Sequence, residues 1–358
     1  MTTVAVIGDS HFDERSRWDE CLSVHHWIRD DIHERRVSAV VHTGDVYERP
    51  SSPRERLAAF DWFESLGVPS AVVRGNHDAM RDLWLLEQVG LCQVVEAAQV
   101  VELAGVAIQC MAWPDTALLH SYEGSPLEAQ RAVLRGLAAQ TSSHERVIFA
   151  GHVQVRSSRV AGNERLVGQA LELGIEDLGL ANAGAYALGH IHLAQTWDVA
   201  THRGSAPVFY PGCPYRRTFG EPDEKGYSLL HWRDGRWVHE WIRTPCRGMH
   251  LITARFDGES GTGTFDGVPA ILGDDDVRIR YTCDASRAAE ARAWFTSWAR
   301  ERCPQAKLEA RTEATASVRA PAVASRRTVP DQLEAMWQAD NVSQAQRKRM
   351  AAMLEGLG

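Results

Sequence analysis

Five short polar clusters carry the side chains with which this chain could do chemistry. In chain order they are Asp9-Ser10-His11, Gly44-Asp45, Gly75-Asn76-His77-Asp78, Gly151-His152 and Gly189-His190-Ile191-His192. Besides His77 and Asp78, they supply two carboxylates, one amide oxygen and four imidazoles. This set fits two divalent ions that share a bridging carboxylate. Nitrogen and oxygen donors without thiolate favour Mn²⁺, Fe²⁺ or Zn²⁺ over Mg²⁺ or Ca²⁺.

The spacing within the clusters indicates how the side chains could converge. On an extended segment, residues i and i+2 project to the same side. Asp9 and His11 could therefore reach one ion, and His190 with His192 repeats that spacing. His77 can transfer protons near neutral pH, and a neighbouring carboxylate such as Asp78 can hold the tautomer of its ring.

Each cluster follows a short apolar run with the composition of a buried strand. These strands are expected over Val4–Gly8, Val37–Val41, Pro69–Val73, Val147–Ala150 and Tyr186–Leu188. Helices are expected over Trp18–Arg36 and after the capping sequences that begin at Ser52 and Ser125, each with proline at the first helical position. Because loops at the carboxyl ends of strands meet at one edge of a sheet, the five clusters should lie together. The alternation predicts an α/β fold with helices on the faces of a sheet.

The ordered motifs D-x-H, GD, GNHD, GH and GHxH resemble the calcineurin-like metallophosphoesterase superfamily over about Val4 to Ile242. The resemblance implies a four-layer α/β/β/α sandwich and two divalent ions per chain, with Mn²⁺ expected first and Fe²⁺, Zn²⁺ or Mg²⁺ possible. It assigns one ion to Asp9, His11, Asp45 and His192, and the other to Asp45, Asn76, His152 and His190. It makes His77 the general acid or transition-state stabiliser, with Asp78 orienting its ring. Two such ions support in-line displacement at phosphorus.

A second stretch, from Tyr210 to Tyr227, resembles the Y-x-G-S-P…F-x-E…K-G segment of the SbcD exonuclease family, with Cys213 in place of the usual serine. Arg216 and Arg217 within it either contact a phosphate or form a solvated turn. Glu48 stands where many relatives have Asp or His, a position that in some of them orients DNA. We therefore name Arg216, Arg217 and Glu48 as candidate substrate contacts.

The rest of the chain divides by composition. We expect a metallophosphoesterase domain over 1–244, a small α+β capping domain over 245–312, a linker over 313–327 and a helical segment over 328–358. The resemblance implies DNA as substrate and an SbcC-type, SMC-like ATPase as a partner that the terminal helices bind. It also implies a homodimer.

Composition limits the alternatives. The 358 residues carry a net charge of −8, whereas a free-standing duplex binder is usually basic. Either the substrate is small, or metals and a partner supply positive charge. The seven cysteines are scattered and never form CxxC, which argues for a reducing cytoplasm. No apolar run is long enough to cross a bilayer, so no membrane association is expected.

The prediction is therefore a two-metal DNA nuclease, a subunit of an SbcCD-like complex. The alternative is a small-molecule phosphodiesterase or nucleotide hydrolase on the same fold, whose activity should survive deletion of 313–358. A third possibility is a partner-binding scaffold with a structural metal site. The filled ligand positions and His77 favour an enzyme over that scaffold.

Overall fold

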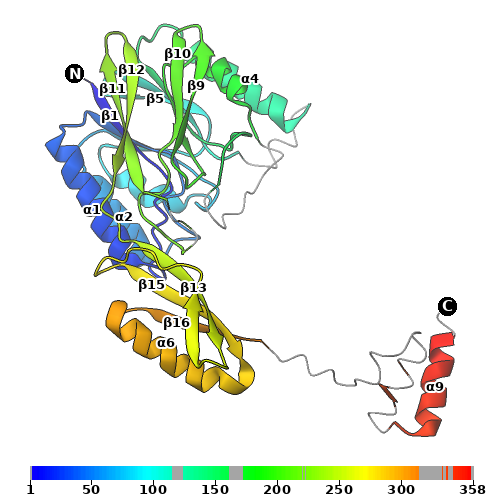
Figure 1. Cartoon of the computed structure of the whole chain (residues 1–358). Coiled ribbons are helices and arrows are strands. Elements are labelled where there is room, and N and C mark those ends of the chain that lie inside the picture. Colours follow the sequence, from blue (N-terminus) through cyan, green and yellow to red (C-terminus); the bar gives the residue numbers. More distant parts are fainter. Residues whose placement is uncertain are drawn as a thin grey trace. The chain divides into compact units, whose positions relative to one another are not determined.

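The computed structural model describes residues 2–114, 124–160, 172–219, 221, 223–313, 333, 336–337 and 342–355. The chain divides into two compact units (Figure 1). The first unit comprises Met1–Leu251 and Ile271–Asp276, and the second comprises Ile252–Ala270 and Val277–Gly358. The first unit thus runs past residue 244, the expected end of the metallophosphoesterase domain. It also includes the loop Ile271–Asp276, which the sequence assigned to the capping domain.

Two six-stranded sheets form the first unit. The first sheet has the order β12-β11-β1-β2-β3-β4, in which β1 to β4 are parallel and β11 and β12 are antiparallel additions at one edge. Its strands are β1 (Thr3–Ile7), β2 (Ala39–His42), β3 (Ser70–Val73), β4 (Cys92–Val95), β11 (Gly226–Arg233) and β12 (Arg236–Arg243).

The second sheet has the order β5-β6-β7-β8-β10-β9. The four inner strands are parallel, and β5 and β9 close the two edges in antiparallel pairing. Its strands are β5 (Gln99–Leu103), β6 (Val106–Met111), β7 (Val147–His152), β8 (Tyr186–Gly189), β9 (Gln195–Thr201) and β10 (Gly204–Tyr210).

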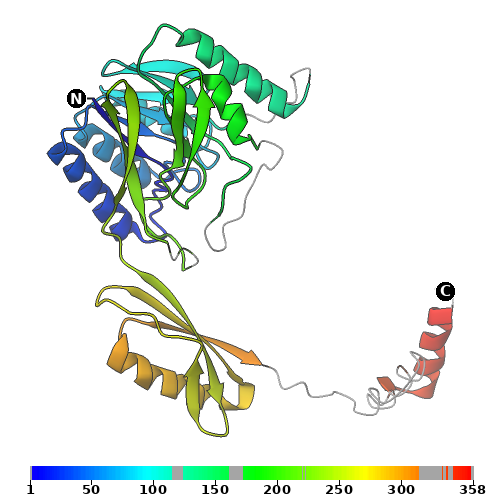
Figure 2. The same ribbon diagram turned by 45° about the horizontal axis from the view of Figure 1, so that its top comes forward.

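Because successive side chains of a strand point to opposite faces of its sheet, the buried residues form three separate core layers. Ala5 and Ile7 of β1 pack with residues of α1 (Trp18–Glu34) and α2 (Pro53–Ser65), whereas Val4 and Val6 pack between the two sheets. On the second sheet, Phe149 of β7 faces α4 (Pro126–Gln140) and α5 (Ile175–Leu178). Helices therefore cover the outer face of each sheet, as Figures 1 and 2 show. The expected α/β/β/α sandwich is confirmed.

Local sequence signals set the helix starts. The Ser52 hydroxyl accepts from the Glu55 amide (3.3 Å), and the Glu55 carboxylate accepts from the Ser52 amide (2.7 Å). These reciprocal bonds satisfy two amides that have no partner within the helix. Ser125 accepts from the Glu128 amide (3.2 Å) at the start of α4 in the same way. Both caps are where the sequence predicts them.

The second unit contains a four-stranded sheet of order β14-β13-β15-β16 with α6 on one face (Figure 2). Phe256 and Tyr281 on that face are buried against Phe295 of the helix. Its elements are β13 (Met249–Asp257), β14 (Thr262–Phe265), β15 (Asp276–Asp284), η4 (Ala285–Arg287), α6 (Ala288–Arg302) and β16 (Lys307–Glu313).

The C-terminal predictions are only partly covered. The expected linker, 313–327, lies outside the described residues apart from Glu313, which ends β16. The expected helix around Leu333 is mostly outside them as well. Helix α9 (Gln344–Glu355) forms the second expected helix, and Ser343 caps it by accepting from the Gln346 amide (3.4 Å). Over the parts of the chain that are described, no helix combines the length and apolarity needed to span a bilayer.

Candidate metal centre

All seven predicted metal ligands lie at or just beyond the carboxyl ends of parallel strands. Asp9 and His11 follow β1, Asp45 follows β2 and Asn76 follows β3. His152 ends β7 of the second sheet, and His190 and His192 follow β8. Both sheets therefore contribute to one cluster, and the strand order places these five strand ends at the centre of the sandwich.

Asp9, His11 and His192 form a first group, in which one ligand atom from each lies within 4.8 Å of the others. The two imidazoles face each other directly, with His11 Nε2 3.0 Å from His192 Nε2. The Asp9 carboxylate also accepts a hydrogen bond from the His190 amide (2.9 Å), which fixes the β8 loop against the β1 loop.

Asp45, His152 and His190 form a second group that Asn76 joins. Asn76 Oδ1 lies 2.8 Å from His152 Nε2 and 2.9 Å from His190 Nδ1. Asp45 Oδ2 lies 3.3 Å from His152 Nε2 and 3.8 Å from His11 Nε2. Asp45 is therefore the side chain that reaches both groups.

The donor set fits divalent cations. His152 Nδ1 donates to the Thr43 carbonyl (2.9 Å), so in the neutral ring the Nε2 lone pair points at the Asn76 oxygen. Such acceptor-to-acceptor contacts need a positive charge between them. Around an ion with bonds of about 2.1 Å, neighbouring ligand atoms lie roughly 3 Å apart, which is the spacing seen in both groups. His190 Nε2 is buried and has no hydrogen-bond partner among the described residues, as expected if His190 is held through Nδ1 instead.

Protonation supplies the positive charge when no metal does. Burial alone would lower the pKa of His152, but the Asp45 carboxylate outweighs it and raises that pKa to about 9. Burial would likewise raise the pKa of Asp45, yet the His152 charge holds it well below its usual range. A metal ion at the second group would compete with this proton for His152.

Backbone strain is concentrated at these ligands. Asp9, His11, Asp45 and His190 all have positive φ (51°, 43°, 54° and 102°), a region that costs a non-glycine residue roughly 1–3 kcal/mol. The prediction that Asp9 and His11 lie on an extended segment is therefore wrong, although left-handed turns bring both to the first group. His190 and His192 do not share a side either, because His190 turns into the second group.

Two motif glycines are required by close approach of the ligands. A Cβ at Gly75 would overlap the Asp45 carboxylate, and one at Gly44 would overlap the His152 ring. Gly44 also has a φ of 108°, which glycine adopts without strain. The glycines thus make room for the ligands as well as turning the chain.

His77 lies beside the first group, with its ring centroid 5.0 Å from that of His11 and its side chain 38% exposed. Its Nδ1 donates to the Glu48 carbonyl (2.7 Å), and its amide donates to Asp45 Oδ1 (2.8 Å). Asp78 does not take the role expected for it. Its carboxylate accepts from the amides of Tyr47 (3.0 Å) and Gly75 (2.9 Å), so it braces the turn while Glu48 orients the ring.

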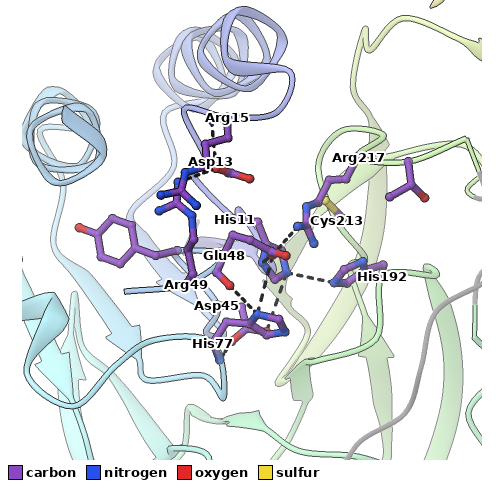
Figure 3. A network of polar contacts seen from close by, with 12 residues as sticks. His11, Asp13, Arg15, Asp45, Glu48, Arg49, His77, His192, Cys213 and Arg217 are labelled. Atoms are coloured by element: carbon purple, nitrogen blue, oxygen red, sulfur yellow. Dashed lines mark hydrogen bonds and ion pairs between the residues drawn. The ribbon is translucent and has the colours of Figure 1, made fainter. Parts of the chain in front are cut away.

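The three candidate substrate contacts are not equivalent. Figure 3 shows the Glu48 carboxylate between Arg217 and His11. It forms an ion pair with Arg217, and Glu48 Oε2 lies 2.8 Å from Nδ1 of His11, whose pKa burial lowers well below its usual value. Arg217 and Glu48 therefore border the first group. Arg216 instead donates to Cys246 Sγ (3.2 Å) and the Arg247 carbonyl (3.3 Å), so the structure does not bring it to the centre.

A buried chain of hydrogen bonds that joins Ser10, His25 and His42 behind the ligand loops was not predicted. The Ser10 hydroxyl lies 2.8 Å from both His25 Nε2 and His42 Nε2. His25 Nδ1 donates to the Cys21 carbonyl (2.7 Å), and His42 Nδ1 accepts from the Gly44 amide (3.3 Å). These bonds assign one tautomer to each neutral ring: Ser10 donates to His25 and accepts from His42. Burial lowers the pKa of His25 to about 4 and that of His42 to about 3.

Comparison with known proteins adds to this geometry. Residues 2–168 match the calcineurin-like phosphoesterase superfamily domain. The chain carries a calcineurin-like metallophosphoesterase domain. With the two ligand groups, this match supports a metal-dependent hydrolase activity for the domain.

Two curated relatives align with this metallophosphoesterase over comparable stretches. It is 25% identical over 244 residues to the DNA double-strand break repair protein Mre11 of Haloferax volcanii, covering 64% of this chain and 49% of that one. It is 26% identical over 246 residues to the uncharacterized metallophosphoesterase YhaO of Bacillus subtilis, covering 66% and 56%. The chain thus spans about half the length of the curated relatives it matches. Among solved structures, a dimetal phosphatase from Danio rerio aligns over 68% of this chain and 96% of that one, with 14% identity and a TM-score of 0.47.

Proposed function

We propose that this metallophosphoesterase is a two-metal nuclease that cleaves DNA phosphodiesters as a subunit of an SbcCD-like end-processing complex. The observation that carries the proposal is the double ligand group joined by Asp45, with His77 and Arg217 on its open side. The similarity to a double-strand break repair protein and the SbcD-like segment from Tyr210 to Tyr227 support DNA as the substrate.

In this proposal Asp9, His11, Asp45 and His192 hold one ion, and Asp45, Asn76, His152 and His190 hold the other. Mn²⁺ is the ion we expect first, since the donors are oxygen and imidazole nitrogen. When bound, the pair supplies Lewis-acid polarisation of the phosphoryl oxygens and a nucleophile for in-line displacement. The buried Ser10–His25–His42 chain keeps the two ligand loops in place.

His77 is the residue we assign to the departing oxygen. Its Nδ1–H is already donated to the Glu48 carbonyl, a bond that both the neutral and the protonated ring can make. Nε2 is therefore the atom left to hold or donate a proton at the open side of the centre. Arg217 can pair with a non-bridging phosphate oxygen if it exchanges its Glu48 partner for the substrate.

Association with other chains is also a proposal. Helix α2 and the 3₁₀ helix η1 (Asp82–Gln88) pack together, and each exposes an apolar side chain: Leu57 is 57% and Trp84 53% exposed. We propose that this surface forms a homodimer. The helical segment 328–358, which includes α9, is proposed to bind the SbcC-type ATPase, which would supply the positive charge for DNA that this chain lacks.

The test is Mn²⁺-dependent cleavage of labelled single- and double-stranded DNA, with bis-p-nitrophenyl phosphate and cyclic nucleotides assayed in parallel. DNA cleavage by the wild-type chain that disappears in His77→Ala, with both metals retained, is the expected result. Turnover of the small esters while DNA stays intact, even with the ATPase partner added, would identify a small-molecule phosphodiesterase instead.

A further inference from the structure

A cavity of about 500 Å³ is lined by residues that neither include nor directly adjoin Glu48 and Arg217 in the sequence. Its lining is mainly apolar and includes Met80, Met111, Trp113 and Ala132. The Trp113 indole is also packed on the second ligand group, with its centroid 4.8 Å from that of His190 and 5.9 Å from that of His152. The cavity and the second ligand group therefore share the Trp113 ring as a wall.

The cavity lining contains one cation, Arg74, and one carboxylate, Glu96. Arg74 directly precedes the Gly75-Asn76-His77 turn and is only 8% exposed. Its guanidinium donates one hydrogen bond, from Nη2 to the Trp113 carbonyl (2.8 Å), and forms no ion pair with a described carboxylate. Arg74 Nε is buried and has no hydrogen-bond partner among the residues described. A buried cation so poorly compensated is costly unless a ligand completes its contacts.

The chemistry of the lining selects the class of ligand. A volume of this size with apolar walls and a single placed cation is typical of a small-molecule site. Free phosphate would gain nothing from methionine and indole surfaces. A nucleobase uses both features, because its faces pack on aromatic and thioether groups and its edge carries acceptors that an arginine can bind.

We propose that this cavity is a nucleobase subsite that takes the base of the nucleotide next to the phosphate being cut, with Trp113 as its wall and Arg74 donating to the base edge. The proposal rests on the proposed cleavage of nucleotide diesters and deepens it by naming a recognition site. Taking up a base requires it to leave its stack, which costs least at an end, a mismatch or a single strand.

The experiment compares esters that share a p-nitrophenolate leaving group and differ in whether the other ester arm carries a nucleoside or only a methyl group. These are thymidine 5′-(p-nitrophenyl phosphate), its 3′ isomer and methyl p-nitrophenyl phosphate, assayed with Mn²⁺. The wild-type chain should prefer at least one thymidine ester over the methyl ester by ~10–100-fold in kcat/KM. In Arg74→Met, and in Ala132→Trp, which fills the cavity, that ratio should fall to about one.

Arg131→Met is the matched control. Arg131 neighbours Ala132 on α4 but is paired with Glu128 and Asp177 and does not line the cavity, so the ratio should stay at its wild-type value. Calorimetric titration of the metal-free proteins with thymidine, an uncharged nucleoside, gives a readout independent of turnover, and Ala132→Trp should weaken it most.

Two results would overturn the subsite: a wild-type ratio near one without saturable thymidine binding, or a ratio that Ala132→Trp leaves unchanged. Failure of the nuclease proposal looks different. In that case polymeric DNA stays intact, while the ester ratio and the thymidine titration still decide what the cavity binds.

Discussion

The two ligand groups share Asp45 but have opposite surroundings. The first group is bordered by charge, with Glu48 in contact with both His11 and Arg217. The second group is bordered by the Trp113 ring and an apolar cavity whose one cation, among the described lining residues, is Arg74. Two similar ions bound here would therefore have different protein surroundings. In the proposed function, the charged side would take the phosphate backbone and the apolar side a base, so the difference between the two sides would orient a nucleotide across the centre.

Removing Asp45, the ligand that the two groups share, should have the largest effect, because it disrupts both groups at once. Replacement Asp45→Ala takes a carboxylate from both groups and leaves His152 without the partner that raises its pKa. Because loss of an outer partner alone costs 10–100-fold, we expect Mn²⁺ binding and turnover to fall by more than about 100-fold. Metal analysis after gel filtration, beside initial rates, measures both. Two retained equivalents of Mn²⁺ would contradict the bridging role.

His77→Ala should separate chemistry from metal binding. His77 belongs to neither of the two ligand groups; the further set of donors that it forms with His11 and Glu48 includes its own exposed ring. Metal content should stay at two ions per chain while kcat falls by ~10²–10⁴-fold, the usual contribution of a positioned acid. Full activity in this variant would remove His77 from the mechanism.

The charged side can be probed with two adjacent arginines. Arg217→Met removes the cation that borders the first group, whereas Arg216→Met removes one held by Cys246 and the Arg247 carbonyl. We expect a ~10-fold loss in kcat/KM for Arg217→Met, from a lost charge-assisted bond to phosphate. Arg216→Met should stay within ~2-fold of wild type by the same reasoning. Equal effects of the two substitutions would show that the difference in placement has no bearing on substrate.

The smallest effect concerns stability. Burial lowers the pKa of His25 from 6.5 to about 4. Between these two pH values the unfolded chain therefore binds a proton at His25 and the folded chain does not. The contribution of His25 is fully present above pH 6.5 and is lost as the pH falls from 6.5 to about 4. The free energy of unfolding should drop over that window by up to about 1.4 kcal/mol per pH unit from this group. Urea unfolding of the metal-free protein should show a shallower pH slope in His25→Gln than in wild type. Equal slopes would mean that His25 is already charged in the folded state.

The sequence predicted what depends on local pattern and on strand direction. Strand ends at Asp9, Asp45 and Asn76 follow from apolar runs that stop at glycine or a polar residue, and the Ser52 and Ser125 caps are four-residue signals. The β9–β10 hairpin was not predicted, because Gln195–Tyr210 mixes exposed polar and buried residues and is held by pairing with β8. Asp78 was placed wrongly because its partners, the Tyr47 and Gly75 amides, come from a turn whose shape only the folded chain sets. The Ser10–His25–His42 chain joins three segments distant in sequence, and only the spacing of His25 with Cys21 and Ile28 on one helical face hinted at its burial.

The loop Ile271–Asp276 has a practical consequence for dissecting the protein. The chain passes between the two units at three points rather than one, after residues 251, 270 and 276. Within the first unit, Asp275 accepts from the Gly248 amide (2.7 Å) and lies 2.8 Å from His250 Nε2, and Asp276 pairs with Arg17. A truncation after Leu251 would therefore remove part of the first unit and expose Arg17. An isolated hydrolase unit is better made by replacing 252–270 with a short linker and ending the chain just after Asp276.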